Sequence, residues 1–92
     1  GLARFCRVRA DFAAGLKSIP GLEVYPSQAN YIMCRLTGSL TATELTVRLL
    51  EDYKILIKDL SGKKGLDGEF IRLAVRRPEE NERLLAALSK LL

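Results

Sequence analysis

The chain has 92 residues, enough for one small domain with a real core. Hydrophobic residues make up 48% and charged residues 28%, which is ordinary for a globular protein and excludes a disordered or low-complexity segment. The formal net charge of +4 raises nucleic-acid binding as a possibility, but the basic residues are scattered and only Lys63-Lys64 and Arg76-Arg77 are adjacent.

The first third of the chain predicts one helix and two strands. Apolar residues recur at three- and four-residue spacing from Leu2 to about Lys17, which is typical of an amphipathic helix, and Pro20-Gly21 ends it. Residues 22–25 alternate apolar and polar, as in a short half-buried strand that Pro26 stops. Residues 31–36 are mostly apolar and predict a strand covered on both faces.

The middle of the chain has the residue pattern of a helix N-terminus. Thr41 and Glu44 stand in capping-box spacing, and Leu40 and Leu45 are placed as the hydrophobic staple across that cap. The predicted apolar stripe of the helix comprises Leu45, Leu49, Leu50 and Tyr53.

The last third predicts two strands and a helix. Residues 55–57 are expected to form a short strand, and residues 58–68 a connection with three glycines. Residues 70–75 are expected to form the final strand. Pro78 suits the first position of a helix. The buried face of that helix comprises Leu84, Leu85, Leu88, Leu91 and Leu92.

The element order α-β-β-α-β-β-α predicts an α+β two-layer domain, with the helices packed on one face of a small sheet. We expect residues 1–92 to form a single small domain. The last two strands are joined directly, with no helix between them, and should be neighbours.

The stretch Phe70–Arg76 poses the main question about function. An apolar run bounded by turn residues predicts a strand largely buried on both faces, yet Arg72 lies inside it. A guanidinium group is seldom buried without a partner. Either Arg72 pairs with Glu23, Asp59 or another carboxylate of its own chain, or it faces a cleft where a ligand supplies the anion.

Several catalytic and metal-binding classes are excluded. The chain has no histidine, so a Ser/His/Asp or Cys/His arrangement is impossible, and no zinc or haem signature is present. Cys6 and Cys34 lie far apart and are expected to be reduced core residues of a cytoplasmic protein. No catalytic residue and no metal ligand is predicted.

Other polar residues have structural interpretations. Asp52, Asp59 and Asp67 lie beside turns and are expected to be solvated. Residues 62–65, Gly-Lys-Lys-Gly, suggest a phosphate cradle but lack the P-loop spacing, so a surface hairpin is favoured. Three arginines, namely Arg35, Arg76 and Arg77, are expected to face water. Three apolar residues, namely Tyr31, Met33 and Phe70, are expected in the core.

Several segments together resemble one family. They are residues 22–31 followed by Arg35, then 54–59, 65–66, 70–76 and 79–81. Their Ser-x-Ala-Asn-Tyr and Ile-Arg-Leu-x-Val patterns resemble the C-terminal small domain of fold-type I pyridoxal-phosphate enzymes. Within these, the chain is most similar to the histidinol-phosphate aminotransferase group of class I/II aminotransferases, which includes threonine-phosphate decarboxylase.

The resemblance implies roles for two residues. Arg72 matches the family arginine that binds the substrate carboxylate. Asn30 matches a position near the domain junction, where its side chain would support the substrate site without touching the reaction. A turn residue that caps the start of the strand is an equal alternative for Asn30. Lys58 stands where many relatives have arginine, so an anion contact from it would be a single-point one.

The resemblance also implies what lies outside this chain. Pyridoxal 5'-phosphate would be bound by a preceding large domain, which carries the lysine that bonds to the cofactor. None of the lysines here matches it; they are Lys17, Lys54, Lys58, Lys63, Lys64 and Lys90. The chain starts without methionine, as a fragment does, and its first residues predict helix instead of a signal peptide.

The function implied is transfer of an amino group between an amino acid of the histidinol-phosphate type and a 2-oxo acid. The implied partners are those small molecules, the large domain and a second copy in a homodimer. A membrane is not expected, because no apolar stretch can span a bilayer. Nucleic acid is not expected either, because the basic residues are spread over the chain. Three alternatives stay open. One is a threonine-phosphate decarboxylase-like domain, and another is a free-standing α+β module that binds anions or nucleic acid. The third is an interaction domain without a ligand, in which Arg72 would be paired within its own chain.

Overall fold

The computed structural model describes residues 1–92 as one α+β domain with the predicted element order. Its helices are α1 (Leu2–Lys17), α2 (Ala42–Tyr53) and α3 (Pro78–Leu91). Its strands are β1 (Leu22–Val24), β2 (Tyr31–Leu36), β3 (Lys58–Asp59) and β4 (Phe70–Ala74). The sheet is antiparallel throughout, in the order β1-β2-β4-β3. The predicted neighbours β3 and β4 are paired.

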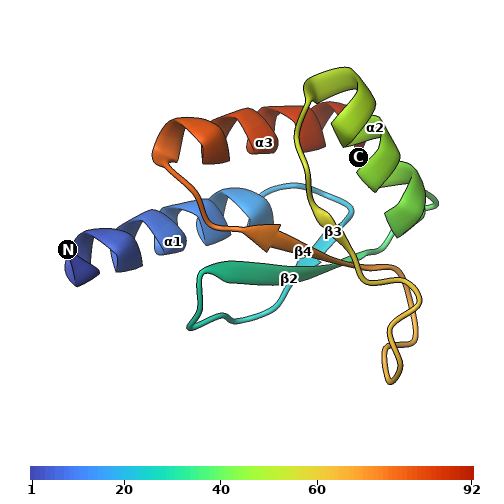
Figure 1. The fold of residues 1–92 in the computed structure, drawn as a ribbon, viewed down its shortest axis with the longest axis horizontal. Helices are drawn as coiled ribbons and strands as arrows, with labels where there is room; N and C mark the ends of the chain where they lie inside the picture. The colour runs from blue at the N-terminus through green and yellow to red at the C-terminus, as the bar shows by residue number, and fades with distance from the viewer.

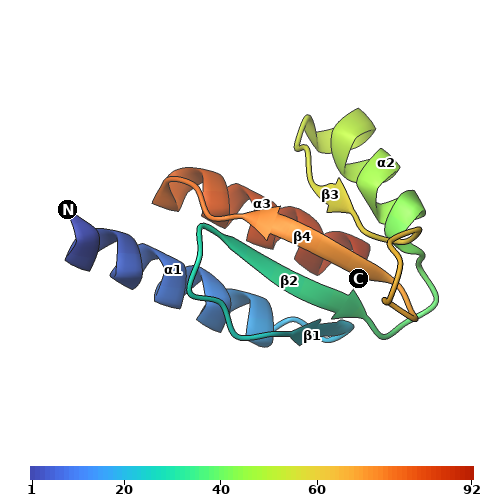
Figure 2. The ribbon, with the colours of Figure 1, turned by 60° about the horizontal axis from the view of Figure 1, so that its bottom comes forward.

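All three helices pack on one side of the sheet (Figure 1). Figure 2 shows α1 and α3 running behind β2 and β4, with α2 beside β3. The buried residues of β2 and β4 that meet the helices are Ile32, Cys34, Leu36, Ile71 and Leu73; we call this side the closed face. The two-layer architecture predicted from the element order is confirmed.

The opposite side of the sheet, the open face, has no helix over it. Its residues on the two central strands and β3 are Tyr31, Met33, Arg35, Lys58, Phe70, Arg72 and Ala74. The prediction that β2 and the 70–76 stretch are covered on both faces is therefore wrong, because burial alternates along both strands with the period of two expected of a one-sided sheet. Tyr31 is 43% exposed and is not a core residue, whereas Phe70 is buried.

The capping signals in the sequence hold at α2. The Thr41 hydroxyl accepts a hydrogen bond from Glu44 N at 3.1 Å, and Glu44 Oε1 accepts one from Thr41 N at 2.9 Å. Of the predicted apolar stripe, Leu45 and Leu49 are fully buried, but Leu50 is 47% exposed and points away from the core.

The short strand predicted at residues 55–57 does not form, and β3 begins at Lys58 instead. Lys54 adopts the left-handed conformation (φ 59°), and Ile55 N donates to Leu49 O at 3.0 Å. Both residues therefore belong to the C-terminal cap of α2 and not to a strand. Ile57 is buried while Leu56 is 76% exposed. Only Lys58 and Asp59 are left in register with β4.

Candidate functional site

Arg72 lies in the middle of the open face, on β4. In the sheet register it stands opposite Met33 of β2 on one side and Lys58 of β3 on the other. Its side chain is exposed. Arg72 therefore leaves the sheet on the face that the helices do not cover.

No carboxylate of the chain pairs with Arg72. Neither Arg72 nor Lys58 takes part in any of the ion pairs, which all join other residues. The Arg72 guanidinium instead lies over the ring of Tyr31, with its central carbon 4.8 Å from the ring centroid. An internal ion pair therefore does not account for an arginine at position 72.

Glu23, one of the two expected partners of Arg72, is taken by other residues. Arg35 donates to its carboxylate through Nε at 3.2 Å and Nη2 at 3.3 Å, and the Tyr25 hydroxyl donates to the same group. The Arg35 bond is the main cause that lowers the pKa of Glu23, and the Tyr25 bond adds to it. Arg35 is thus half-buried and paired, not simply solvated as the sequence predicted.

Asp59, the other expected partner, points to the helix side of the sheet. It stands opposite Ile71, whose side chain is on the closed face. The Thr43 hydroxyl donates to Asp59 Oδ2 at 2.6 Å and Ser61 N to Oδ1 at 2.8 Å. The Thr43 bond, followed by that from Ser61, lowers the pKa of Asp59. The prediction that Asp59 is merely solvated is wrong, because its carboxylate ties β3 to the start of α2.

Asn30 lies immediately before β2 and is exposed. Its carbonyl oxygen accepts a hydrogen bond from Val75 N at 2.8 Å, which joins the start of β2 to the end of β4. It lines the largest cavity, about 740 Å³, between the first half of α1 and the connection from β4 to α3. Arg72 does not line that cavity. The structure therefore brings the two predicted residues to neighbouring places and not into one pocket.

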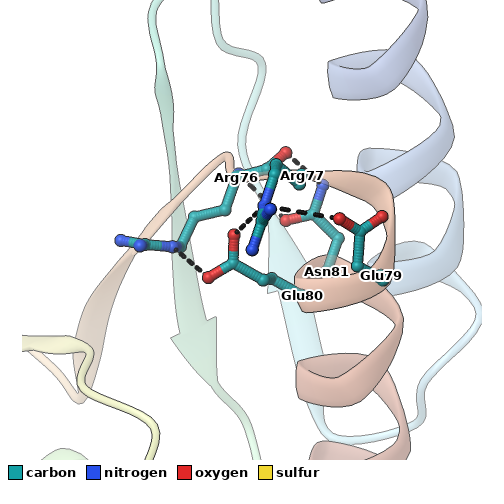
Figure 3. Close-up of polar contacts among 5 residues, drawn as sticks. All are labelled: Arg76, Arg77, Glu79, Glu80 and Asn81. Carbon is teal, nitrogen blue, oxygen red and sulfur yellow. Dashed lines mark hydrogen bonds and ion pairs between the residues drawn. The ribbon is translucent and has the colours of Figure 1, made fainter.

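The connection from β4 to α3 is fixed by a residue that sequence reasoning missed. Asn81 is 5% exposed, and its amide bonds the backbone of Arg76 twice, accepting from N and donating to O, both at 3.0 Å (Figure 3). A single asparagine in the first turn of a helix, after a proline, is the only signal the sequence offers. The bonds set the direction in which the chain leaves β4.

Arg76 and Arg77 are exposed, as predicted, but they also form ion pairs at the start of α3 (Figure 3). Each Nε lies 3.0 Å from a carboxylate oxygen of Glu80, and Arg77 Nε lies 3.3 Å from Glu79. Arg77 and Arg76 lower the pKa of Glu80. These two arginines are compensated, in contrast to Arg72.

Residues 62–65, the glycine-lysine segment, lie in the connection between β3 and β4. This connection is the surface hairpin that the sequence favoured. Lys63 N donates to Leu60 O at 3.0 Å and Leu66 N to Lys63 O at 3.2 Å, and both lysines are exposed. The loop extends from the sheet on the side away from the helices (Figure 1).

The remaining reactive residues do not assemble a catalytic set. No group of three or more His, Cys, Asp or Glu side chains could hold a metal ion. Burial raises the pKa of the Cys34 thiol to about 12. Cys6 is exposed on α1, so the expectation that both cysteines are core residues is wrong for Cys6. No helix is both long and apolar enough to cross a membrane.

Comparison with known proteins adds an independent result. The chain is 39% identical over 90 residues to a histidinol-phosphate aminotransferase of Roseiflexus castenholzii, covering 97% of the chain and 24% of that protein. It is 37% identical to an L-serine phosphate decarboxylase of Sulfurospirillum multivorans, covering 97% of the chain and 23% of that protein. The chain thus spans about a quarter of the length of these relatives.

The fold agrees with solved structures of the same group. The crystal structure of L-threonine-O-3-phosphate decarboxylase from Porphyromonas gingivalis superposes with a TM-score of 0.90 at 35% identity, over 97% of this chain and 27% of that one. The sequence profile of the family described as aminotransferase class I and II matches residues 2–88. The chain belongs to the class I and II aminotransferase family.

Proposed function

We propose that the chain is the C-terminal small domain of a pyridoxal-phosphate enzyme and that Arg72 binds the carboxylate of its amino-acid substrate. The observation that carries the proposal is an exposed arginine, central on the open face, with no carboxylate partner in its own chain. Both candidate internal partners are held elsewhere, Glu23 by Arg35 and Asp59 by Thr43. The Arg72 guanidinium group is therefore free to bind the carboxylate of a ligand.

The chemistry of a guanidinium group suits this role. Its planar fork donates two parallel N–H bonds to a carboxylate, which fixes the orientation of the substrate as well as its position. Orientation matters because a reaction at Cα is fast only when the substrate is held in one geometry relative to the reacting groups. In this proposal Arg72 binds and orients, and it moves no proton.

The residues of this chain do not themselves fit pyridoxal phosphate. The largest cavity has arginines and one glutamate on its walls but no lysine to bond to the cofactor and no aspartate for its ring nitrogen. We therefore assign the cofactor, which stabilises negative charge at Cα, to the rest of a longer protein. The large domain and a homodimeric partner belong to the same proposal, with the relatives' greater length in its favour.

Two reactions are candidates for the whole enzyme. Amino transfer between a histidinol-phosphate-type amino compound and a 2-oxo acid is the first, favoured by the Roseiflexus relative. Histidinol phosphate has no carboxylate, so in that reaction Arg72 would bind the amino acid or 2-oxo acid partner. The second is decarboxylation of a phosphorylated amino acid, favoured by the TM-score of 0.90 with the Porphyromonas enzyme.

The carboxylate clamp is tested in the intact enzyme that contains this chain. Arg72→Ala should lower kcat/KM for the amino-acid substrate by a factor of about a hundred or more, because a bidentate charged contact is lost. Arg72→Lys should recover only part of the loss, since an ammonium group makes one-point contacts. Arg48→Ala, an exposed arginine on α2, is the matched control and should leave the rate unchanged. An unchanged kcat/KM for Arg72→Ala would refute the clamp.

Product analysis separates the two reactions. The intact enzyme is incubated with O-phospho-L-serine or O-phospho-L-threonine alone, and in parallel with L-histidinol phosphate and 2-oxoglutarate. Release of CO₂ in the first mixture assigns a decarboxylase, and formation of L-glutamate in the second assigns an aminotransferase.

A further inference from the structure

Tyr31 is a large aromatic residue in an unexpected place. It is the first residue of β2, stands opposite Ala74, and lies diagonally across the sheet from Arg72. Both side chains are on the open face, where Tyr31 is 43% exposed. An exposed aromatic ring contributes less to the core than a buried one, so packing alone does not account for it.

The contact that Tyr31 does make is with Arg72. The guanidinium carbon lies 4.8 Å from the ring centroid, well within the distance at which an aromatic face attracts a cation. The ring face accepts no strong hydrogen bond, so the N–H donors of the guanidinium group stay available to a ligand. A carboxylate partner would hold the arginine too, but it would also consume those donors.

The backbone around Tyr31 is held at several points. The Ser27 hydroxyl donates to Tyr31 O and accepts from Ala29 N at 3.2 Å, which closes the turn before β2. Val75 N donates to Asn30 O at 2.8 Å, which joins that turn to the end of β4. The ring therefore projects from a fixed base, and the long, flexible arginine is the side chain that gains order from the contact.

We propose that Tyr31 is a positioning residue, whose ring holds the Arg72 guanidinium group in place for a substrate carboxylate. This inference rests on the proposed function of Arg72. The Tyr31 hydroxyl takes part in no hydrogen bond with another residue, so the ring face and not the phenol carries the effect. The ring acts before the substrate arrives, and its loss should appear mainly as weaker substrate binding.

The test uses the intact enzyme and the L-amino acid it converts fastest, chosen from the common amino acids, O-phospho-L-serine and O-phospho-L-threonine. Tyr31→Leu removes the aromatic face and should raise KM about threefold to thirtyfold, with kcat changed less than twofold. Tyr31→Phe keeps the face and should stay within twofold of the wild type in both constants. If Tyr31→Leu does not fold by circular dichroism, Tyr31→Gln replaces it.

A double variant separates this inference from the proposal on which it rests. In the Arg72→Ala background, Tyr31→Leu should have no further effect on kcat/KM, because the ring acts only through the arginine. Added guanidinium should restore part of the activity of Arg72→Ala and clearly less of that of the double variant, which lacks the ring to hold it.

The outcomes are distinct. If no amino acid is converted, or if Arg72→Ala leaves kcat/KM unchanged, the clamp itself fails and the role of Tyr31 fails with it. If Arg72→Ala is impaired but Tyr31→Leu is normal, if Tyr31→Phe is as impaired as Tyr31→Leu, or if the two losses are additive, the clamp stands and the positioning role of Tyr31 is overturned.

Discussion

The two faces of the sheet are built from the same strands but carry different kinds of residue. On the closed face, Ile32, Cys34, Ile71 and Leu73 are buried against three helices. On the open face, the residues that alternate with them include an uncompensated arginine and an exposed tyrosine. One strand, β4, therefore carries a stabilising residue and a candidate binding residue side by side, because side chains along a strand point alternately to the two faces. Stability and binding can be changed separately by neighbouring substitutions.

The largest expected difference is between Leu73 and its neighbour Arg72. Leu73→Ala should destabilise the 92-residue chain by ~2–5 kcal/mol, because it leaves a cavity in a fully buried site. Arg72→Ala removes an exposed side chain and should cost at most about 0.5 kcal/mol. Urea unfolding of both variants measures the difference, and equal losses would mean that the two faces are not distinct in stability.

The two cysteines offer a second comparison, between the closed face and the outer surface of α1. Cys34 is fully buried and its pKa is raised to about 12, whereas Cys6 is exposed. A thiol-specific reagent at pH 8 should modify Cys34 at least about a hundred times more slowly than Cys6, since modification requires the core to open. Cys6→Ser and Cys34→Ala assign the two rates. Similar rates would show that the closed face is accessible.

Asn81 stands where β4 passes into α3, at the boundary of both layers. Asn81→Ala removes two hydrogen bonds to the Arg76 backbone and should destabilise the chain by ~1–3 kcal/mol. Glu82→Ala, at an exposed position of the same helix, is the control and should have little effect. Amide exchange at Arg76 should speed up in Asn81→Ala, and unchanged exchange would contradict the structural role.

Asp59 should give the smallest effect, visible as a dependence of stability on pH. Its pKa is lowered in the folded chain below the ordinary value of 3.8, so its contribution is fully present above that value and is lost as pH falls through the folded pKa. Because the group is only partly buried, the contribution should not exceed about 1 kcal/mol. Asp59→Asn should therefore lower stability at pH 7 and make no difference near pH 2. A loss equal at both pH values would assign the effect to packing.

Local signals predicted much of the secondary structure. The bounds of β2, the capping box at Thr41 and the proline at the start of α3 were all readable, because each depends on residues within four positions of one another. The strand predicted at residues 55–57 is absent, because the left-handed residue Lys54 ends α2 immediately before that segment. An apolar run of three residues does not show where the preceding helix ends.

The candidate site was predictable only in part. Arg72 stands out in the sequence as a charge inside an apolar strand, but its ring partner Tyr31 and the engagement of Glu23 and Asp59 depend on register. A shift of one residue in pairing would move Arg72 to the closed face. Tyr31 was expected in the core because aromatic residues usually are, and no local pattern distinguishes an open face from a covered one.

The element order, the α+β class and the presence of an arginine in an apolar strand are all readable in the sequence, because periodicity and capping are local properties of the chain. The tertiary structure decided that one face of the sheet stays uncovered and that the two expected partners of Arg72, Glu23 and Asp59, are bonded to other residues. It also decided that an aromatic ring, not an acid, lies against Arg72. Those facts depend on strands far apart in the chain meeting in one register, which residue spacing does not specify.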